Sequence, residues 1–155
     1  MLSVIIPAYN EELSVERAYY TISEILEKAQ IDNEIIFIDD GSTDTTYKKI
    51  ESLADKEKNI YGLHFSRNFG KEAAISAGLA SAKGDAVVVI DCDLQHPPEK
   101  IVEMYHLWQE GYEIVEGIKK TREIVCRRLR RFPVILKLWQ RIWAFPFFVA
   151  LSFPE

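Results

Sequence analysis

A run of five apolar residues followed by two closely spaced carboxylates is the feature that constrains this chain most strongly. Ala86–Ile90 contains alanine, valine and isoleucine only, and a short run of this kind is typical of a strand buried on both faces in a parallel sheet. Asp91 and Asp93 follow that strand, and open α/β sheets bind ligands at the carboxyl ends of their strands. Alternate side chains of an extended backbone lie on the same side, so both aspartates can face one crevice.

Two carboxylates in one crevice repel each other unless a cation or hydrogen-bond donors lie between them. Hard divalent cations such as Mg²⁺ or Mn²⁺ prefer oxygen ligands and often keep substrate phosphate oxygens in their remaining coordination positions. Asp91 and Asp93 are therefore candidate metal ligands. A simpler alternative is that they are loop carboxylates that cap the next helix, whose start is indicated by Pro97 and Pro98.

The composition is that of one domain with a sizeable core: 155 residues, of which 48% are hydrophobic and 28% charged. The net charge of -5 hides an asymmetry, because residues 1–118 have an excess of acidic side chains and residues 119–155 an excess of basic ones. Cys92 and Cys126 form neither a metal-type pair nor a disulfide framework, which favours a reducing compartment. The apolar run Leu2–Ile6 is too short for a signal peptide.

Apolar strands and amphipathic helices alternate along residues 1–118. The predicted strands are Leu2–Ile6 (ended by Pro7), Glu34–Ile38, Ile60–Ser66, Ala86–Ile90 and Tyr112–Gly117. The predicted helices run from Leu13 to about Ala29, from about Tyr47 to Ala54, from Lys71 to Ala82 and from Pro98 to Glu110. Short connections between such elements imply right-handed crossovers. The sequence therefore predicts an α/β, Rossmann-like fold, with a mainly parallel sheet and helices on both faces.

Charged residues follow successive strands, which the fold alone does not require. One of Asp39 and Asp40 can accept hydrogen bonds from a nucleotide base or ribose. The alternative is turn chemistry, because the side chains of Asp, Ser and Thr bond nearby backbone N–H groups. Lys71 begins a predicted helix, where a cation opposes the helix dipole. A phosphate bound at that N-terminus would remove the conflict; a solvated lysine is the other interpretation.

His64 and His96 are the two histidines considered as candidate ligands. His64 is predicted to be a packed or surface residue, and His96 is not expected to bind a metal, although it can contact a phosphate.

Two classes of nucleotide-binding enzyme do not fit the glycine pattern of this chain. A nicotinamide dehydrogenase requires Gly-x-Gly-x-x-Gly after its first strand, and Pro7–Asn10 contains no glycine. Gly70-Lys71-Glu72 lacks the hydroxyl and the preceding glycine of a P-loop.

Four segments together resemble the inverting GT-A glycosyltransferases of family 2. They are Val4–Glu12 (VIIPAYNEE), Ile38–Asp44 (IDDGSTD), Ser66–Ala74 (SRNFGKEAA) and Asp91–Pro98 (DCDLQHPP). Within that family they are similar to the branch that includes dolichol-phosphate mannose synthase and bacterial undecaprenyl-phosphate glycosyltransferases. The resemblance covers about residues 2–118, which would form a nucleotide-sugar-binding domain with the three-layer GT-A fold.

The resemblance implies a role for each matching residue. The nucleotide sugar would be held by Pro7, Tyr9, Asn10, Glu11, Asp39, Asp40, Arg67, Lys71 and Asp91. Mg²⁺ or Mn²⁺ would be held by Asp91, Asp93 and Gln95, with Asp91 and Asp93 as the catalytic residues.

The resemblance also implies a reaction, in which a sugar passes from a UDP- or GDP-sugar to a polyprenyl phosphate with inversion. A nucleoside diphosphate is a poor leaving group until a metal neutralises its developing charge. A lipid phosphate is already anionic near neutral pH, because its second pKa is about 6. It can therefore attack the anomeric carbon without a general base. The implied location is the cytoplasmic face of a membrane, with no nucleic-acid partner.

Residues 119–155 match no motif of that branch beyond about Arg122, where its members continue with acceptor-site residues and usually membrane helices. The uncharged run Ile142–Phe153 is too short to span a bilayer of ~30 Å. We expect this basic, aromatic segment to lie at a membrane interface; alternatively, it covers the protein's own core. A third interpretation is a fragment or a changed reading frame, which would leave a truncated nucleotide-sugar-binding domain without transfer activity.

Overall fold

The computed structural model describes residues 1–120, 123–129 and 149–150, with side chains through residue 117. The described elements, in chain order, are β1 (Leu2–Ala8), α1 (Val15–Lys28), β2 (Asn33–Asp39), α2 (Thr46–Ala54), β3 (Ile60–His64), α3 (Lys71–Ser81), β4 (Ala86–Val89), α4 (Lys100–Gln109), β5 (Ile114–Lys120), β6 (Glu123–Leu129) and β7 (Val149–Ala150). The strands form one sheet in the order β3-β2-β1-β4-β7-β5-β6. Every strand and helix predicted for residues 1–118 is present, with ends that differ by a few residues.

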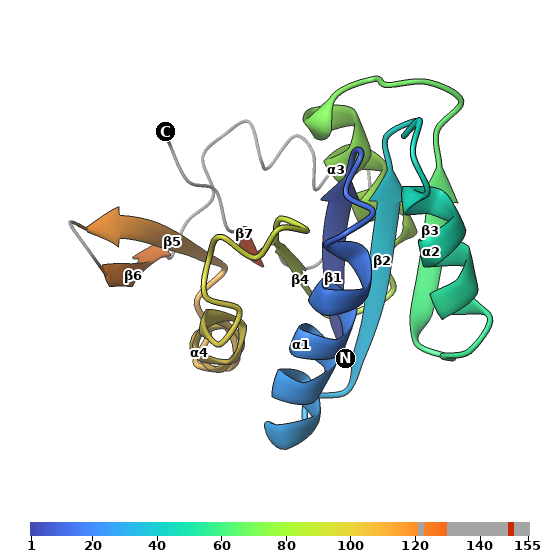
Figure 1. The fold of residues 1–155 in the computed structure, drawn as a ribbon. Helices are drawn as coiled ribbons and strands as arrows, with labels where there is room; N and C mark the ends of the chain where they lie inside the picture. Colours follow the sequence, from blue (N-terminus) through green and yellow to red (C-terminus); the bar gives the residue numbers. More distant parts are fainter. Residues whose placement is uncertain (121–122, 130–148, 151–155) are drawn as a thin grey trace.

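The first four strands are parallel to one another, as predicted. Helices cover both faces of this part of the sheet, which gives the three layers seen in Figure 1. Side chains of β1 alternate between the two faces of the sheet and so contribute to two separate hydrophobic clusters. Val4 and Ile6 lie in the larger cluster, which includes residues of α1, α2 and α4. Ile5 faces the other way and lies in the smaller cluster, which includes Ala74 of α3. The predicted α/β architecture is confirmed.

The strand predicted to be buried on both faces is β4, and all of its residues are buried. It lies beside β1 in the middle of the parallel sheet, so its side chains have no solvent-facing side. Ile90, just beyond it, is also buried. Asp91 and Asp93 therefore follow closely after a fully packed strand, which fixes the backbone position at which they begin.

The prediction that Pro7 ends the first strand is wrong, because β1 continues through Pro7 to Ala8. Alternate residues of a strand direct their backbone groups to the same neighbour, and the Ile5 carbonyl accepts the N–H of Ile90 from the β4 side. The nitrogen of Pro7 therefore faces the β4 side. The register of β4 against β1 ends at Ile5, opposite Val89. Pro7 removes no ladder hydrogen bond, which is the condition under which a strand tolerates proline.

Beyond α4 the sheet continues with the predicted strand β5 and with two strands, β6 and β7, that the sequence did not predict. β5 and β6 form an antiparallel pair, and β7 lies between β4 and β5, parallel to both. The domain boundary predicted after residue 118 lies inside β5. Most of the basic, aromatic segment for which we predicted a membrane-interfacial role lies outside the described residues. None of the helices in the described ranges is long and apolar enough to cross a bilayer.

Candidate functional site

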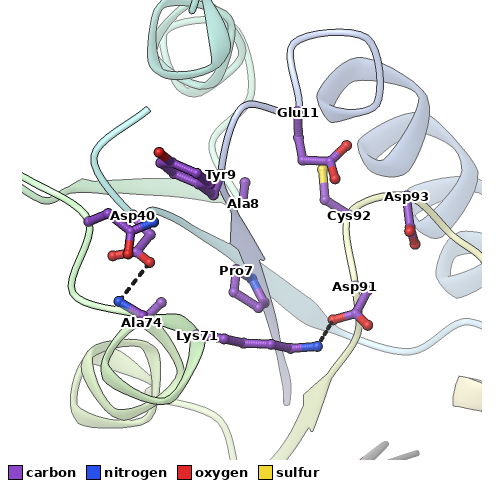
Figure 2. A pocket seen from close by; sticks show the side chains of 12 residues that line it. Pro7, Ala8, Tyr9, Glu11, Asp40, Lys71, Ala74, Asp91, Cys92 and Asp93 are labelled. Carbon is purple, nitrogen blue, oxygen red and sulfur yellow. Dashed lines mark hydrogen bonds and ion pairs between the residues drawn. The ribbon is translucent and has the colours of Figure 1, made fainter. Parts of the chain in front are cut away.

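A pocket of about 310 Å³ opens at the carboxyl edge of the parallel strands, around the ends of β1 and β4 (Figure 2). The side chains and backbone that line it come from the end of β1, from the loops after the first four strands and from the start of α3. They are Pro7, Ala8, Tyr9, Glu11, Asp40, Asn68, Gly70, Lys71, Ala74, Asp91, Cys92 and Asp93. This is the place at which an open α/β sheet binds ligands.

Both aspartates of the pair after β4 line this pocket, as their spacing predicted. Asp93 Oδ1 accepts the N–H of Gln95 at 3.0 Å, which shapes the turn. Arg17 of α1 donates to the backbone oxygen of Asp93 at 2.9 Å and holds the turn from outside. The alternative that these aspartates cap the next helix is wrong, because the N-cap of α4 is Glu99 and no side chain caps it.

The acidic pair after β2 divides its two carboxylates between different surroundings. Asp39 is fully buried: its Oδ2 lies 2.5 Å from Nδ1 of His64, and its Oδ1 accepts the N–H of Ser42 at 3.3 Å. Asp40 lines the pocket and accepts the N–H groups of Phe69 and Gly70 at 2.8 and 2.9 Å. Turn chemistry, the simpler interpretation of this pair, thus describes the contact from Asp39 to Ser42 but not those of Asp40, whose partners are 29 and 30 residues away in the sequence.

Lys71 is the first residue of α3, as predicted, and its Nζ lies 2.6 Å from Oδ1 of Asp91 across the pocket (Figure 2). This contact argues against the interpretation of a merely solvated lysine, although half of the side chain is exposed. The Asp40 carboxylate lies at the start of α3, where it accepts the N–H of the N-cap residue Gly70. A negative charge at that position is favourable for the helix dipole.

Four other predicted residues do not line the pocket: Asn10, Asp39, Arg67 and Gln95. Asn10 Oδ1 accepts the N–H of Thr43 at 2.9 Å and joins the loops after β1 and β2. The guanidinium of Arg67 lies over the Phe69 ring, 4.8 Å from its centroid. Gln95 is exposed. The binding roles implied for these residues stay predictions: Asp39 is buried at the end of β2, and the other three lie in the loops that follow the strands.

Several lining residues were absent from the predicted site. Asn68 and Gly70 lie within a segment that the resemblance had already marked, and Ala74 lies one helical turn after Lys71, a spacing that places both on one face of α3. Cys92 lies between the two aspartates, and the alternation of side chains along an extended backbone would turn it away from the crevice that they face. Burial raises the pKa of its thiol from 9.0 to about 12, so this cysteine is not a nucleophile near neutral pH.

The charges of the lining suit a bound cation. Four carboxylates (Glu11, Asp40, Asp91, Asp93) face a single ammonium group, that of Lys71, among the described residues of the lining. Within the described ranges no three His, Cys, Asp or Glu side chains are grouped as a complete metal site. Two carboxylates are nevertheless sufficient for Mg²⁺, which commonly binds one or two of them together with substrate phosphates and water. Asp91 and Asp93 fit that pattern.

Comparison with known families and curated proteins gives a consistent result. The profile described as "Glycosyl transferase family 2" matches residues 3–149. An uncharacterized glycosyltransferase, YkcC of Bacillus subtilis, is 40% identical over 78% of this chain and 38% of its own length. A bactoprenol glucosyl transferase of Shigella phage SfV is 41% identical over 84% of this chain and 42% of its own length. The chain thus spans about two fifths of the length of these relatives.

Solved structures agree on the fold. The glucosyl-3-phosphoglycerate synthase of Mycobacterium tuberculosis, solved in complex with UDP, superposes with a TM-score of 0.60 at 28% identity, over 79% of this chain and 45% of that one. A mannosyltransferase of Pyrobaculum calidifontis, solved with GDP-Man and Mn²⁺, gives a TM-score of 0.64 at 24% identity, over 77% of this chain and 35% of that one. The second likeness concerns the fold alone.

Proposed function

The chain belongs to glycosyl transferase family 2, and from that premise we propose that it transfers a sugar from a UDP- or GDP-sugar to a polyprenyl phosphate, with metal assistance and inversion at the anomeric carbon. The observation that supports this most directly is the juxtaposition of Asp91, Asp93 and Lys71 in one pocket at the carboxyl edge of the sheet. Two carboxylates and one ammonium group are complementary to a diphosphate that carries a divalent cation.

We assign the pocket residues as follows. Pro7, near the end of β1, and Tyr9 and Glu11, in the loop after it, contact the base and ribose, and Tyr9 is exposed enough to do so. Asp91 and Asp93 hold Mg²⁺ or Mn²⁺ and are the catalytic residues. Lys71 contacts a phosphate of the donor. Asn10, Asp39, Arg67 and Gln95 contribute from the rim or through the loops that they hold.

The chemistry that follows is a single displacement. When bound, the metal neutralises the charge that develops on the nucleoside diphosphate as it leaves. The ammonium group of Lys71 stabilises the same charge from the opposite wall of the pocket. Asp91 and Asp93 would hold the metal against the diphosphate, and the acceptor phosphate attacks the anomeric carbon as the bond from that carbon to the nucleoside diphosphate breaks. No general base is required, because the acceptor is already an anion near neutral pH.

The acceptor proposal has a narrower basis than the donor proposal. It rests on the resemblance of the sequence motifs and on the relative whose name is bactoprenol glucosyl transferase. We place the reaction at the cytoplasmic face of a membrane, where such a lipid phosphate is reached, and assign membrane contact to residues 119–155. We likewise propose residues 1–118 as the donor-binding domain.

The donor proposal is tested by calorimetric titration of the chain with UDP-glucose and GDP-mannose, each with and without Mn²⁺. We expect one donor to bind only in the presence of the metal, and that donor identifies the base. Absence of binding by either donor contradicts the proposal.

Transfer to the acceptor is measured separately, by incubating the chain with the bound donor and undecaprenyl phosphate in detergent. Formation of a lipid-linked sugar supports the complete reaction. Metal-dependent donor binding with no product under any condition instead supports the second candidate function, a nucleotide-sugar-binding domain that does not catalyse transfer. The short span of the relatives' length that this chain covers motivates that alternative.

A further inference from the structure

Asp40 is a buried lining residue whose carboxylate is already bound by backbone N–H groups. The residue is 4% exposed, and its two carboxylate oxygens accept the backbone N–H groups of Phe69 and Gly70. Its own N–H donates to the carbonyl of Ala8 at the end of β1, at 2.9 Å. Asp40 therefore connects the central strand β1 to a loop that arrives from β3, at the edge of the sheet.

The loop that Asp40 holds leads directly into α3. Gly70 is the N-cap of α3, with φ of 98°, and its carbonyl accepts the N–H of Ala74 at 3.1 Å. Lys71 follows as the first helical residue. A shift of the Gly70 N–H away from Asp40 would therefore turn the first residue of the helix, and with it the direction of the Lys71 side chain.

Gly41 reinforces the same contact from the other side. Its φ is +70°, and a Cβ at this position would lie 2.3 Å from the backbone carbon of Arg67. The turn after Asp40 thus packs directly against the backbone of the loop that Asp40 binds. The approach is too close for any residue but glycine, so the loop has little room to settle elsewhere.

We infer that Asp40 is a positioning residue, which acts through the N–H groups of Phe69 and Gly70 to direct Lys71 across the pocket to Asp91. Figure 2 shows both ends of this arrangement, with dashed lines at the Asp40 carboxylate and between Lys71 and Asp91. The main role of Asp40 is then to position this loop and Lys71, and not to contact the nucleotide directly. The positioning of Lys71 by Asp40 concerns this chain alone, whereas the effect of that positioning on donor binding rests on the proposed function.

Two substitutions separate this role from general support of the fold. Asp40→Asn keeps one acceptor oxygen and presents an amide donor to the second backbone N–H, so one of the two hydrogen bonds is lost. Asp44→Asn is the matched control, because the Asp44 carboxylate also accepts two backbone N–H groups, those of Thr46 and Glu12, at 2.9 and 3.3 Å. Asp44 does not contact the loop that leads into α3.

The first measurement is the rate at which an N-hydroxysuccinimide ester acylates Lys71 in the full chain, quantified by mass spectrometry against Lys58 as an internal reference. In Asp40→Asn we expect this rate to rise to that of Asp91→Asn, by about two- to fivefold, the range that an exposed ion pair supports. Asp44→Asn should leave it unchanged. An unchanged rate in Asp40→Asn, or an equal rise in Asp44→Asn, would overturn the inference.

The second measurement is the affinity for UDP with Mn²⁺ in Asp40→Asn, Lys71→Met and the double variant. If Asp40 acts through Lys71, the double variant binds no more weakly than Lys71→Met; additive losses would overturn the inference. Failure of the unchanged chain to bind UDP or GDP contradicts the proposed function instead, and the acylation rates then decide the inference alone.

A third measurement covers the case in which Asp40→Asn does not fold. In the unchanged chain, the Phe69 and Gly70 amides should be protected from hydrogen exchange, although the Phe69 side chain is half exposed. Fast exchange at both amides would mean that Asp40 does not hold them.

Discussion

Two acidic pairs of similar composition perform different tasks in this molecule because their spacing differs. Asp91 and Asp93 are separated by one residue, and both line the pocket. Asp39 and Asp40 are adjacent, so an extended backbone turns them to opposite sides. One is buried against His64, and the other faces the pocket edge and binds two backbone N–H groups. The family motifs include both pairs, but only the geometry separates the buried Asp39 from the three aspartates that line the pocket.

At the same scale, Asp93→Ala should abolish metal-dependent donor binding and leave the fold intact. The Asp93 carboxylate lies beyond the packed strand and accepts only the N–H of Gln95 among the hydrogen bonds described for it. Calorimetry with the identified donor and Mn²⁺ measures the first effect, and circular dichroism the second. Asp85→Ala is the control, since Asp85 is exposed and pairs with the chain's N-terminal amine, away from the pocket. Unchanged metal-dependent affinity in Asp93→Ala would refute the metal assignment.

The buried thiol of Cys92 makes a prediction about pH. Its pKa in the folded chain is about 12, raised mainly by burial from 9.0. Between these values the unfolded thiol loses its proton while the folded one keeps it, so its contribution to stability is complete below pH 9 and falls as the pH rises toward 12.

Urea unfolding of the chain and of Cys92→Ala at pH 8 and pH 10 measures this contribution. The free energy of unfolding should fall more in the unchanged chain than in the variant. The same fall in both would assign the pH dependence to other groups, such as lysines and tyrosines.

At the scale of elements, α3 determines where the pocket wall lies. It packs on β1 and β2 through a close approach at Gly78, where a Cβ would lie 2.5 Å from Cγ2 of Ile5 and 2.8 Å from Cδ1 of Ile38. The helix that presents Lys71 can therefore lie near the sheet only if this position has no side chain. The distance from Lys71 to Asp91 depends on this packing as well as on Asp40.

Gly78→Ala should destabilise the chain, because overpacking a core usually costs about 1–3 kcal/mol. The gain of about 1 kcal/mol in helix propensity offsets part of this cost and leaves a net loss of up to about 2 kcal/mol. Chemical denaturation followed by circular dichroism measures the change. Ala80→Ser, which adds one atom on the exposed side of the same helix, is the control and should change the stability little. A more stable Gly78→Ala variant would show that α3 has room to move outward.

At the scale of the whole molecule, a buried polar network and the candidate pocket lie at opposite edges of the sheet. At the amino edge, the buried Glu34 carboxylate accepts the Ser3 hydroxyl and the N–H of Lys83, both at 2.6 Å, and Ser3 in turn accepts the N–H of Gly84. This network joins β1, β2 and the turn before β4. The pocket lies at the carboxyl edge of the same strands.

Glu34→Ala should therefore lower stability without weakening donor binding. Loss of the carboxylate leaves buried donors unsatisfied, at a cost of about 1–3 kcal/mol. Glu24→Ala is the control, since Glu24 forms an exposed ion pair with Lys28, and such pairs contribute little. Thermal unfolding and calorimetric affinity are measured on both variants. A parallel loss of donor affinity in Glu34→Ala would mean that the two edges are coupled through the sheet.

The sequence by itself determined the α/β order, the buried strand β4 and the pocket position of Asp91, Asp93 and Lys71. These features depend on local periodicity and on the general rule that ligands bind at the carboxyl ends of parallel strands. It did not determine that β1 continues through Pro7, because that depends on where the neighbouring β4 ends. Nor did it determine β6 and β7, whose pairing partners are set by the sheet.

The tertiary structure alone decided which polar residues face the pocket and which support it. Asn10 belongs to the same motif as Tyr9 and Glu11, and Asp39 and Asp40 belong to a second motif, yet each of the three has a hydrogen-bond partner in another segment of the chain. A motif shows that residues occur together in a chain. The direction of each side chain depends on contacts between segments far apart in sequence, such as that between Asp40 and Gly70, and these contacts exist only in the folded molecule.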